Sequence, residues 1–238
     1  MFRRMVLSLL GLVSPAVAAT AGEEPAPLRV ATFQVDATPP LGSPLCGGGV
    51  KPAAEVIDLL SARGVVLLTD QSPIVLCAID WVGIGNGGHD AFRAALAEAA
   101  GTTPDRVTVH TLHQHDAPAC DFTAEELLDA EGLGGVMFDP KFARLVIART
   151  ARAVKQSLGK ARPVTHVGLG VGVVEKVASN RRILGPDGRV AIVRYSSSRN
   201  PAAVAAPEGV IDPKLRLVSL WDGDRPLVSI THYATHPQ

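Results

Sequence analysis

Residues 62–82 contain two apolar runs joined by a short polar turn, and no other feature limits the possible folds of this chain as strongly. The runs are ARGVVLLTD (62–70) and SPIVLCAIDWV (72–82), with Asp70-Gln71-Ser72-Pro73 between them. This pattern indicates a β-hairpin, with Pro73 at a strand start where its missing N–H removes no needed hydrogen bond. The chain therefore has to place a pair of antiparallel, buried strands in its first third.

A strand–helix–strand unit is predicted directly after the hairpin. Residues 89–101 have the apolar spacing of a helix that ends at Gly101, and residues 105–112 alternate like a strand. Other predicted elements are a strand in 28–42, a helix over 139–159 capped by Asp139, a strand over 163–174 and hairpins over 183–195 and 215–233, with loops over 116–138 and 196–213. Hairpins mixed with strand–helix–strand units predict a single α/β domain with a mixed β-sheet and flanking helices.

The N-terminus is typical of an exported protein. Arg3 and Arg4 precede an apolar run from Met5 to Val13, and Ala16-Val17-Ala18 has the form of a cleavage site. We therefore expect a signal peptide over residues 1–18, a flexible leader over 19–27 and a folded domain over 28–238. The chain stops directly after a predicted strand, so we expect this domain to be incomplete at its C-terminus.

Charge gives no reason to expect a macromolecular partner. Lysine and arginine number 23 and aspartate and glutamate also number 23, without a long basic stripe. This balance does not favour nucleic-acid or anionic-membrane binding, and the short apolar run at the N-terminus is not a transmembrane segment.

Three cysteines give few clues to a site. Cys46 and Cys120 lie in loops, and Cys77 lies within an apolar strand. A Cys46–Cys120 disulfide is one pairing that an oxidising compartment would allow, although the sequence does not fix it. Without a C-x-x-C pair, the sequence does not favour a thiolate zinc site.

The segment VHTLHQHDAP (109–118) holds three of the seven histidines and is the strongest candidate site. If the strand stays extended, His113 and His115 share one face and their rings can approach a single ion. His110 falls on the opposite face, where we expect a structural role. Asp116 is placed to ligate, to orient a histidine or to act as a base. The residues alone leave open a metal site, an acid–base site or a polar loop.

Further site residues are expected where other strands end. His236 in SITHYATHPQ (229–238) follows a strand and could supply another ligand, and Arg181 in SNRR (179–182) could bind an anionic group. For His89, His166, Asp36 and Asp80 we expect structural roles.

A glycine-rich motif offers a competing interpretation. GIGNGG (83–88) matches G-x-G-x-x-G between a strand and a helix, as in dinucleotide-binding turns. The hairpin that precedes it and the signs of export favour a plain glycine loop near the site instead.

With these residues collected, the chain resembles the N-terminal catalytic region of neutral, zinc-dependent ceramidases and their bacterial ceramidase-like relatives. The resemblance runs in order through VDATPPLG (35–42), the hairpin, HTLHQHDAP (110–118), SNRR and THYATHPQ (231–238). It implies that His113 and His236 bind Zn²⁺, that His115 assists the chemistry beside the metal and that Arg181 organises the site. The implied reaction is hydrolysis of an N-acyl amide such as ceramide, so the resemblance implies a small-molecule or lipid amide substrate as the partner.

Two departures from the family pattern shape the expectations. The family's small Ser-Gly pair is here Asp116-Ala117, which adds a charge near the metal. The family's remaining zinc ligands, a glutamate and a tyrosine, are expected beyond Gln238. We therefore keep two alternatives: a zinc amidase or esterase for a polar substrate, with Asp116 as base or extra ligand, and an inactive secreted binding domain of the same fold.

Overall fold

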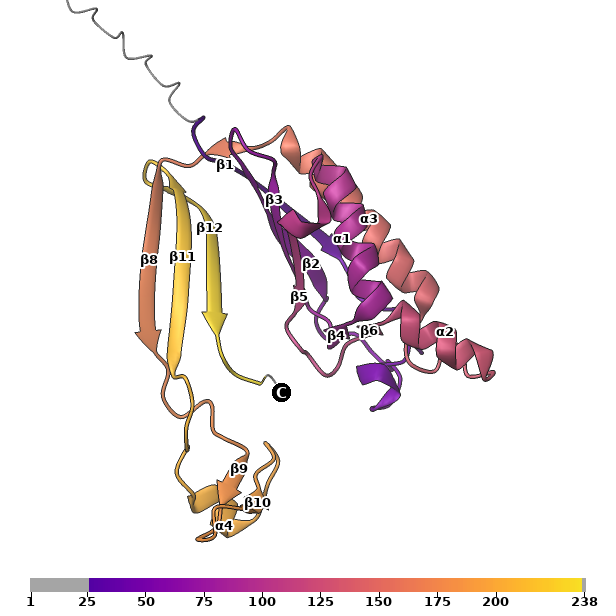
Figure 1. Ribbon diagram of the computed structural model, residues 1–238, viewed down its shortest axis with the longest axis vertical. Coiled ribbons are helices and arrows are strands. Elements are labelled where there is room, and N and C mark those ends of the chain that lie inside the picture. The colour runs from indigo at the N-terminus through magenta and orange to yellow at the C-terminus, as the bar shows by residue number, and fades with distance from the viewer. Residues whose placement is uncertain (1–25, 237–238) are drawn as a thin grey trace, which may run out of the picture.

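The computed structural model describes residues 26–236 and arranges them in two facing β-layers with helices on one outer side (Figure 1). The predicted signal peptide and all but the end of the predicted leader lie outside the described residues. The elements in chain order are β1 (Arg29–Asp36), β2 (Ser61–Leu68), β3 (Ile74–Ile79), β4 (Gly83–Ile84), α1 (Asn86–Ala100), β5 (Val107–Thr111), β6 (Ala119–Cys120), α2 (Phe122–Ala130), α3 (Pro140–Leu158), β7 (Arg162–Pro163), β8 (His166–Val173), β9 (Arg182–Leu184), β10 (Val190–Val193), α4 (Pro201–Ala205), β11 (Lys214–Asp222) and β12 (Arg225–Tyr233).

The first layer is a five-stranded sheet in the order β5-β3-β2-β1-β7. The hairpin predicted from residues 62–82 forms β2 and β3, which pair antiparallel from Ala62↔Ile79 to Leu67↔Ile74. Helix α1 then crosses over to β5, which pairs parallel with β3. The sheet is therefore mixed, as the sequence predicts, because one strand–helix–strand crossover is added to an antiparallel set.

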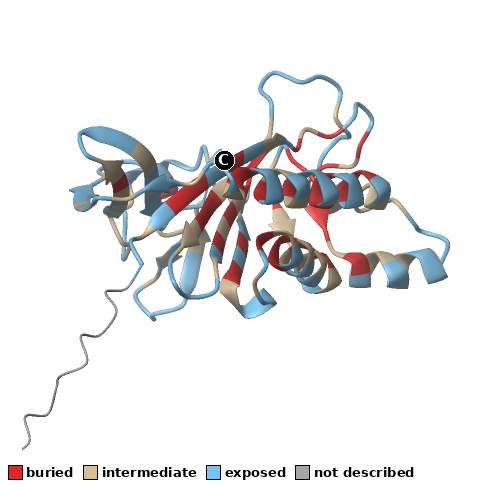
Figure 2. Cartoon of the chain, turned by 90° about the horizontal axis from the view of Figure 1, so that it is seen from above, coloured by how far each residue is buried: buried red, intermediate tan, exposed pale blue. Residues whose placement is uncertain are grey.

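Helices α1 and α3 cover the outer face of this sheet, away from the second layer (Figure 1). Trp81, which is fully buried, packs edge-on against Phe92 with ring centroids 5.9 Å apart, and its indole N–H donates to the Ala37 carbonyl at 2.9 Å. Figure 2 shows the buried residues as stripes along the strands and helices. Most of the buried hydrophobic core lies in this helix-covered half.

The second layer is the three-stranded antiparallel sheet β12-β11-β8. It packs on the first sheet through a small cluster, in which Leu220 of β11 meets Val30 and Val65. A cavity of about 440 Å³ lies beside this contact and is lined by strands of both sheets. Because few side chains fill the space between the sheets, the second layer is held much less tightly than α1 and α3 are.

Several local expectations were wrong. The segment 116–138, expected to be a loop, contains β6 and α2; Asp121 caps α2 by accepting from the Ala124 N–H at 3.1 Å. The strand expected over 163–174 is split into β7 and β8, and the segment 196–213 contains the short helix α4. The helix expected over 139–159 is confirmed as α3, with Asp139 accepting from the backbone N–H groups of Lys141 and Phe142.

Among the described residues, no helix combines the length and the apolar character that crossing a bilayer requires.

Candidate metal centre

Three histidines converge between the two layers, at the ends of β5 and β12. His113 and His115 lie in the loop after β5, and His236 follows β12. The three ring centroids are 4.9, 4.8 and 4.8 Å apart, with the rings nearly perpendicular to one another. One nitrogen from each ring lies within 4.8 Å of the others. The arrangement is therefore a three-nitrogen cluster of the size that one metal ion could join.

A backbone turn, rather than strand alternation, directs His113 into this cluster. Strand β5 ends at Thr111, and His113 adopts a left-handed conformation with φ of 61°. The His113 N–H donates to the Trp81 carbonyl at 3.1 Å, which ties the loop to the end of β3. The expectation that alternation continues through His115 was wrong, although the two rings do meet.

His113 is oriented by a backbone carbonyl. Its Nδ1 atom lies 2.7 Å from the carbonyl oxygen of Val82. Because a carbonyl can only accept, the hydrogen sits on Nδ1, and Nε2 keeps its lone pair. A histidine held in this way is typical of metal ligands, whose second nitrogen commonly donates to a backbone carbonyl or carboxylate.

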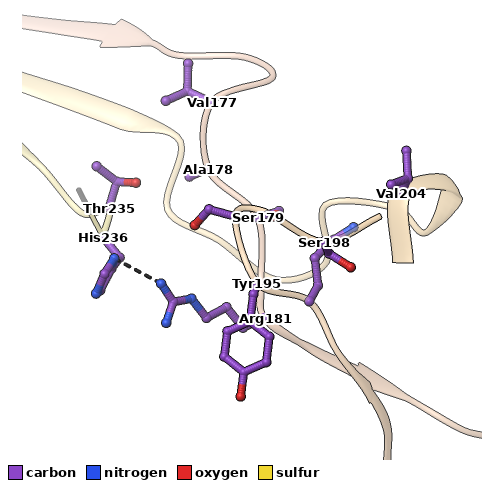
Figure 3. A pocket seen from close by; sticks show the side chains of 11 residues that line it. Val177, Ala178, Ser179, Arg181, Tyr195, Ser198, Val204, Thr235 and His236 are labelled. Carbon is purple, nitrogen blue, oxygen red and sulfur yellow. Dashed lines mark hydrogen bonds between the residues drawn. The ribbon is translucent and has the colours of Figure 1, made fainter. Parts of the chain in front are cut away.

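His236 is oriented by Arg181. Figure 3 shows the guanidinium reaching the ring, with Nη2 of Arg181 3.0 Å from Nδ1 of His236. Because a guanidinium only donates, Nδ1 is the acceptor here. A metal bound through either nitrogen of His236 therefore requires this hydrogen bond to break: ligation at Nδ1 displaces Arg181, and ligation at Nε2 places a hydrogen on Nδ1.

The donor set suits a transition metal such as zinc. Imidazole nitrogens are common zinc ligands, whereas magnesium and calcium prefer oxygen, and among residues 26–236 the cluster contains no carboxylate. Catalytic zinc sites typically have three protein ligands and keep one position open. The spacing of His113 and His115 led us to expect that both rings approach one ion, whereas the family resemblance placed His115 beside the metal. The structure brings a nitrogen of His115 into the cluster.

Asp116 does not join the cluster. It lies on the next part of the loop, where its backbone N–H donates to the Gln114 side chain at 3.2 Å. Gln114 and Asp116 line a separate cavity of about 460 Å³ with residues of the 38–60 segment. Along this loop, His113 and His115 face the cluster, whereas Gln114 and Asp116 face the neighbouring cavity.

His110 was expected to be a packed or hydrogen-bonded core residue, but it lines the cavity between the two sheets, where part of its surface is exposed and part is covered. Partial burial there lowers the pKa of the His110 ring, and the nearby His232 of β12 lowers it further. His166, by contrast, lies on the surface with its Nδ1 2.8 Å from the Thr165 hydroxyl.

The two acids expected to be structural make local hydrogen bonds. Asp36 accepts from the Thr38 N–H at 2.8 Å, and hydrogen bonds to Thr38 lower the pKa of the Asp36 carboxyl. The buried Asp80 accepts from the N–H and hydroxyl of Ser61 and from Arg63, at 2.7 to 2.9 Å. Neither belongs to the histidine cluster.

The glycines of 83–88 serve packing instead of dinucleotide binding. The start of α1 is covered by the start of α2, where Asn86 donates to Asp121 at 2.6 Å and the Gly87 N–H donates to the Thr123 hydroxyl at 3.1 Å. A side chain at Gly88 would place its Cβ 2.6 Å from the Cys120 carbonyl oxygen. The antiparallel β2–β3 pair before the motif is also unlike a dinucleotide-binding unit.

The fold has known counterparts, whereas the sequence has none at the level of family models or curated proteins, since neither comparison gives a match. The neutral ceramidase from Pseudomonas aeruginosa superposes with a TM-score of 0.63 and 16% identity, over 89% of this chain and 32% of that chain. A ceramidase complexed with C2 gives a TM-score of 0.57 and 16% identity, over 89% of this chain and 31% of the other.

The chain has a ceramidase-like fold. It spans about a third of the length of those ceramidases. The resemblance in the short motifs thus agrees with the fold. At 16% identity these matches show similarity of fold alone.

Proposed function

We propose that this chain is the metal-binding part of an exported, zinc-dependent amidohydrolase that cleaves an N-acyl amide bond with water. The observation that carries the proposal is the cluster of His113, His115 and His236, whose nitrogens lie within 4.8 Å of one another. The ceramidase-like fold supports it. Export is proposed from the signal-peptide pattern of residues 1–18.

The three histidines would hold the ion. Zinc bound there would supply Lewis acidity, which polarises a carbonyl group and activates a water molecule. The Val82 carbonyl holds the His113 ring in place, and Arg181 holds cationic N–H donors beside His236. The catalytic roles of His115, Asp116 and Arg181 remain predictions. Asp116 would act as a base only on a substrate that extends into its own cavity.

A polar substrate is the second candidate, in place of ceramide. The specific observation is that charged side chains flank the cluster: Arg181 contacts His236, and Asp116 follows His115 in the chain. Burying these charges against an alkyl chain would cost free energy. A zinc amidase or esterase for a polar substrate would keep them solvated or paired.

Zinc content tests the proposal directly. We expect about one zinc per chain in purified protein by mass spectrometry of the metal, and loss of that zinc in His113→Ala, His115→Ala and His236→Ala. His166→Ala is the matched control, because it removes an exposed histidine outside the cluster. Turnover of short N-acyl compounds then separates a hydrolase from an inactive binding domain. Protein that binds no zinc in zinc-replete buffer would contradict both hydrolase candidates.

A further inference from the structure

We infer that the substrate carries a carboxylate next to the amide that is cleaved, as in an N-acyl amino acid, and that Arg181 binds this carboxylate. The inference rests on the proposed amidohydrolase function, because that function places the scissile amide at the histidine cluster. It is argued from the charges of two cavities, one lined in part by His236 and the other lined by Gln114 and Asp116 of the loop that carries His113 and His115.

The cavity on the Arg181 side is cationic. It has a volume of about 330 Å³ and opens beside His236 (Figure 3). Its lining includes Arg181 and Arg194 and no aspartate or glutamate. Ser179, Ser196 and Ser198 add hydroxyl groups. Two guanidinium groups without a lining carboxylate favour an anionic ligand.

The two arginines have different roles. Arg194 is committed to the fold, since its guanidinium donates to backbone carbonyls that include those of Ala203, Ala206 and Asn180 at 2.8 to 3.1 Å. The bond to the Asn180 carbonyl fixes the backbone immediately before Arg181. Arg181 itself forms no ion pair among the described residues, where the paired arginines are Arg63, Arg162 and Arg216.

Arg181 can therefore bind a ligand with its remaining N–H groups. A guanidinium carries five donors in a planar fork that matches a carboxylate, and the contact to His236 uses one of them. Binding a carboxylate would pair a charge that the described residues leave without an acidic partner.

The second cavity, which Gln114 and Asp116 line, is negatively charged. The opposite charges of the two cavities would therefore set the orientation of a bound substrate. Its lining contains Glu55, Asp58 and Asp116 against one cation, Lys51. An anionic end would be repelled there and attracted on the Arg181 side. The remaining part of the substrate, the acyl group, would point away from Arg181.

Arg181 and His236 line the same cavity, which limits how far the carboxylate lies from the amide. A group bound by the guanidinium in this cavity lies next to the cluster. In an N-acyl amino acid, three bonds separate the amide carbonyl carbon from the carboxylate carbon, a span of roughly 3 to 4 Å. This spacing allows Arg181 to bind the carboxylate while the amide lies at the histidines.

The reaction is a hydrolysis and needs no other reactant. Water adds its oxygen to the acyl carbon as the C–N bond breaks, and the amino nitrogen leaves with a proton from that water. The products are a carboxylic acid and a free amino acid, whose carboxylate is unchanged and stays on Arg181 until release.

Binding to metal-free protein tests the inference independently of catalysis. Isothermal titration would compare N-octanoylglycine with N-octanoylethanolamine, which share an acyl chain and an amide but differ in the carboxylate. We expect at least about ten-fold tighter binding of N-octanoylglycine, because a charge-assisted bidentate contact is strong. Arg181→Gln should abolish this preference, and Arg189→Gln, at an exposed turn outside the cavity, should keep it.

Equal affinity for the two compounds would overturn the inference, and so would a preference that survives in a folded Arg181→Gln protein. Tighter binding of N-octanoyl-O-phosphoethanolamine than of N-octanoylglycine would also overturn it, because the anion would then be a phosphate. Circular dichroism and thermal melting would establish that the Arg181→Gln protein is folded. Arg181→Lys provides a second variant, which keeps the positive charge. Failure of this inference leaves zinc binding and amide hydrolysis untouched, whereas failure of the proposed function shows as absent zinc with the carboxylate preference intact.

Discussion

Nη2 of Arg181 lies 3.0 Å from Nδ1 of His236, so a cation donates a hydrogen bond to one of the three clustered histidines. The contact and a bound metal compete for the same ring, since metal binding through either nitrogen of His236 prevents Arg181 from donating to Nδ1. The positive charge of the guanidinium also repels a metal ion. Arg181 therefore opposes metal binding at this ring.

We predict that Arg181→Gln binds zinc about five-fold more tightly than the unchanged chain. The metal no longer has to break a hydrogen bond worth about 1 kcal/mol. Competition with a chromophoric chelator would measure the affinities, with Arg189→Gln as the control. Weaker zinc binding in Arg181→Gln would mean that the arginine holds His236 in its ligating position.

Gly88→Ala is predicted to lower the free energy of unfolding by about 1 to 3 kcal/mol, because the new Cβ would lie 2.6 Å from a backbone oxygen that cannot move freely. Gly159→Ala is the matched control: the added Cβ meets no atom within 4 Å, and the residue already has right-handed helical angles. There we expect no loss, and a gain of up to about 0.5 kcal/mol. Urea unfolding would compare the two, and equal stabilities would refute the close approach of α1 to β6.

Acid is predicted to destabilise the chain through His110. Its pKa is lowered in the folded protein by partial burial and by His232, and Arg63 lines the same cavity. The unfolded chain takes up the proton near pH 6.5, so stability from the neutral ring is present above that pH. It is lost as the pH falls from 6.5 through the lower pKa of the folded state.

His110→Asn should reduce this acid sensitivity, because asparagine does not titrate. Urea midpoints between pH 7.5 and 5 would show a smaller drop for the variant than for the unchanged chain. His166→Asn, at an exposed surface histidine, should leave the drop as it was. A variant at position 110 with an undiminished drop would place the acid sensitivity elsewhere.

The thiols are predicted to differ in reactivity. Burial raises the pKa of Cys77 and of Cys120 to about 12, so neither forms the reactive thiolate near neutral pH. Cys46 is half-buried, and all three thiols are unpaired in the structure. A thiol reagent should label Cys46 alone in the native protein and all three cysteines in denaturant. Labelling of Cys77 alone in denaturant without reductant would instead show the Cys46–Cys120 disulfide.

The sequence predicted those parts of the fold that depend on local pattern. Two apolar runs with a polar turn between them located the β2–β3 hairpin, and Asp139 with Pro140 located the start of α3. Helix α2 was missed, although Asp121 and the helix-forming residues after it were a readable start signal. The division into two β-layers was also missed, because contacts such as Leu220 with Val65 join distant parts of the chain.

The sequence predicted which residues form the candidate site better than it predicted how they are arranged. His113 and His236 were expected together because each follows a strand, and they do converge. The positive φ of His113 could not be anticipated, because histidine rarely takes that conformation and only the surrounding contacts impose it. The outward direction of Asp116 follows from the same turn.

Because the cluster draws on both layers, it cannot exist before the second sheet is complete. His113 and His115 come before the second sheet in the chain, whereas His236 follows its last strand, β12. The ring of His236 can contact the other two only after β12 has packed near the end of β5. Contacts between such distant residues form late in folding, since a long loop must close first. A metal ion bound here would join the two layers and would stabilise their docked arrangement by RT ln(1 + [metal]/Kd), a gain that grows with the logarithm of its affinity. The supply of that metal during folding would thereby influence how much of the protein reaches the docked arrangement.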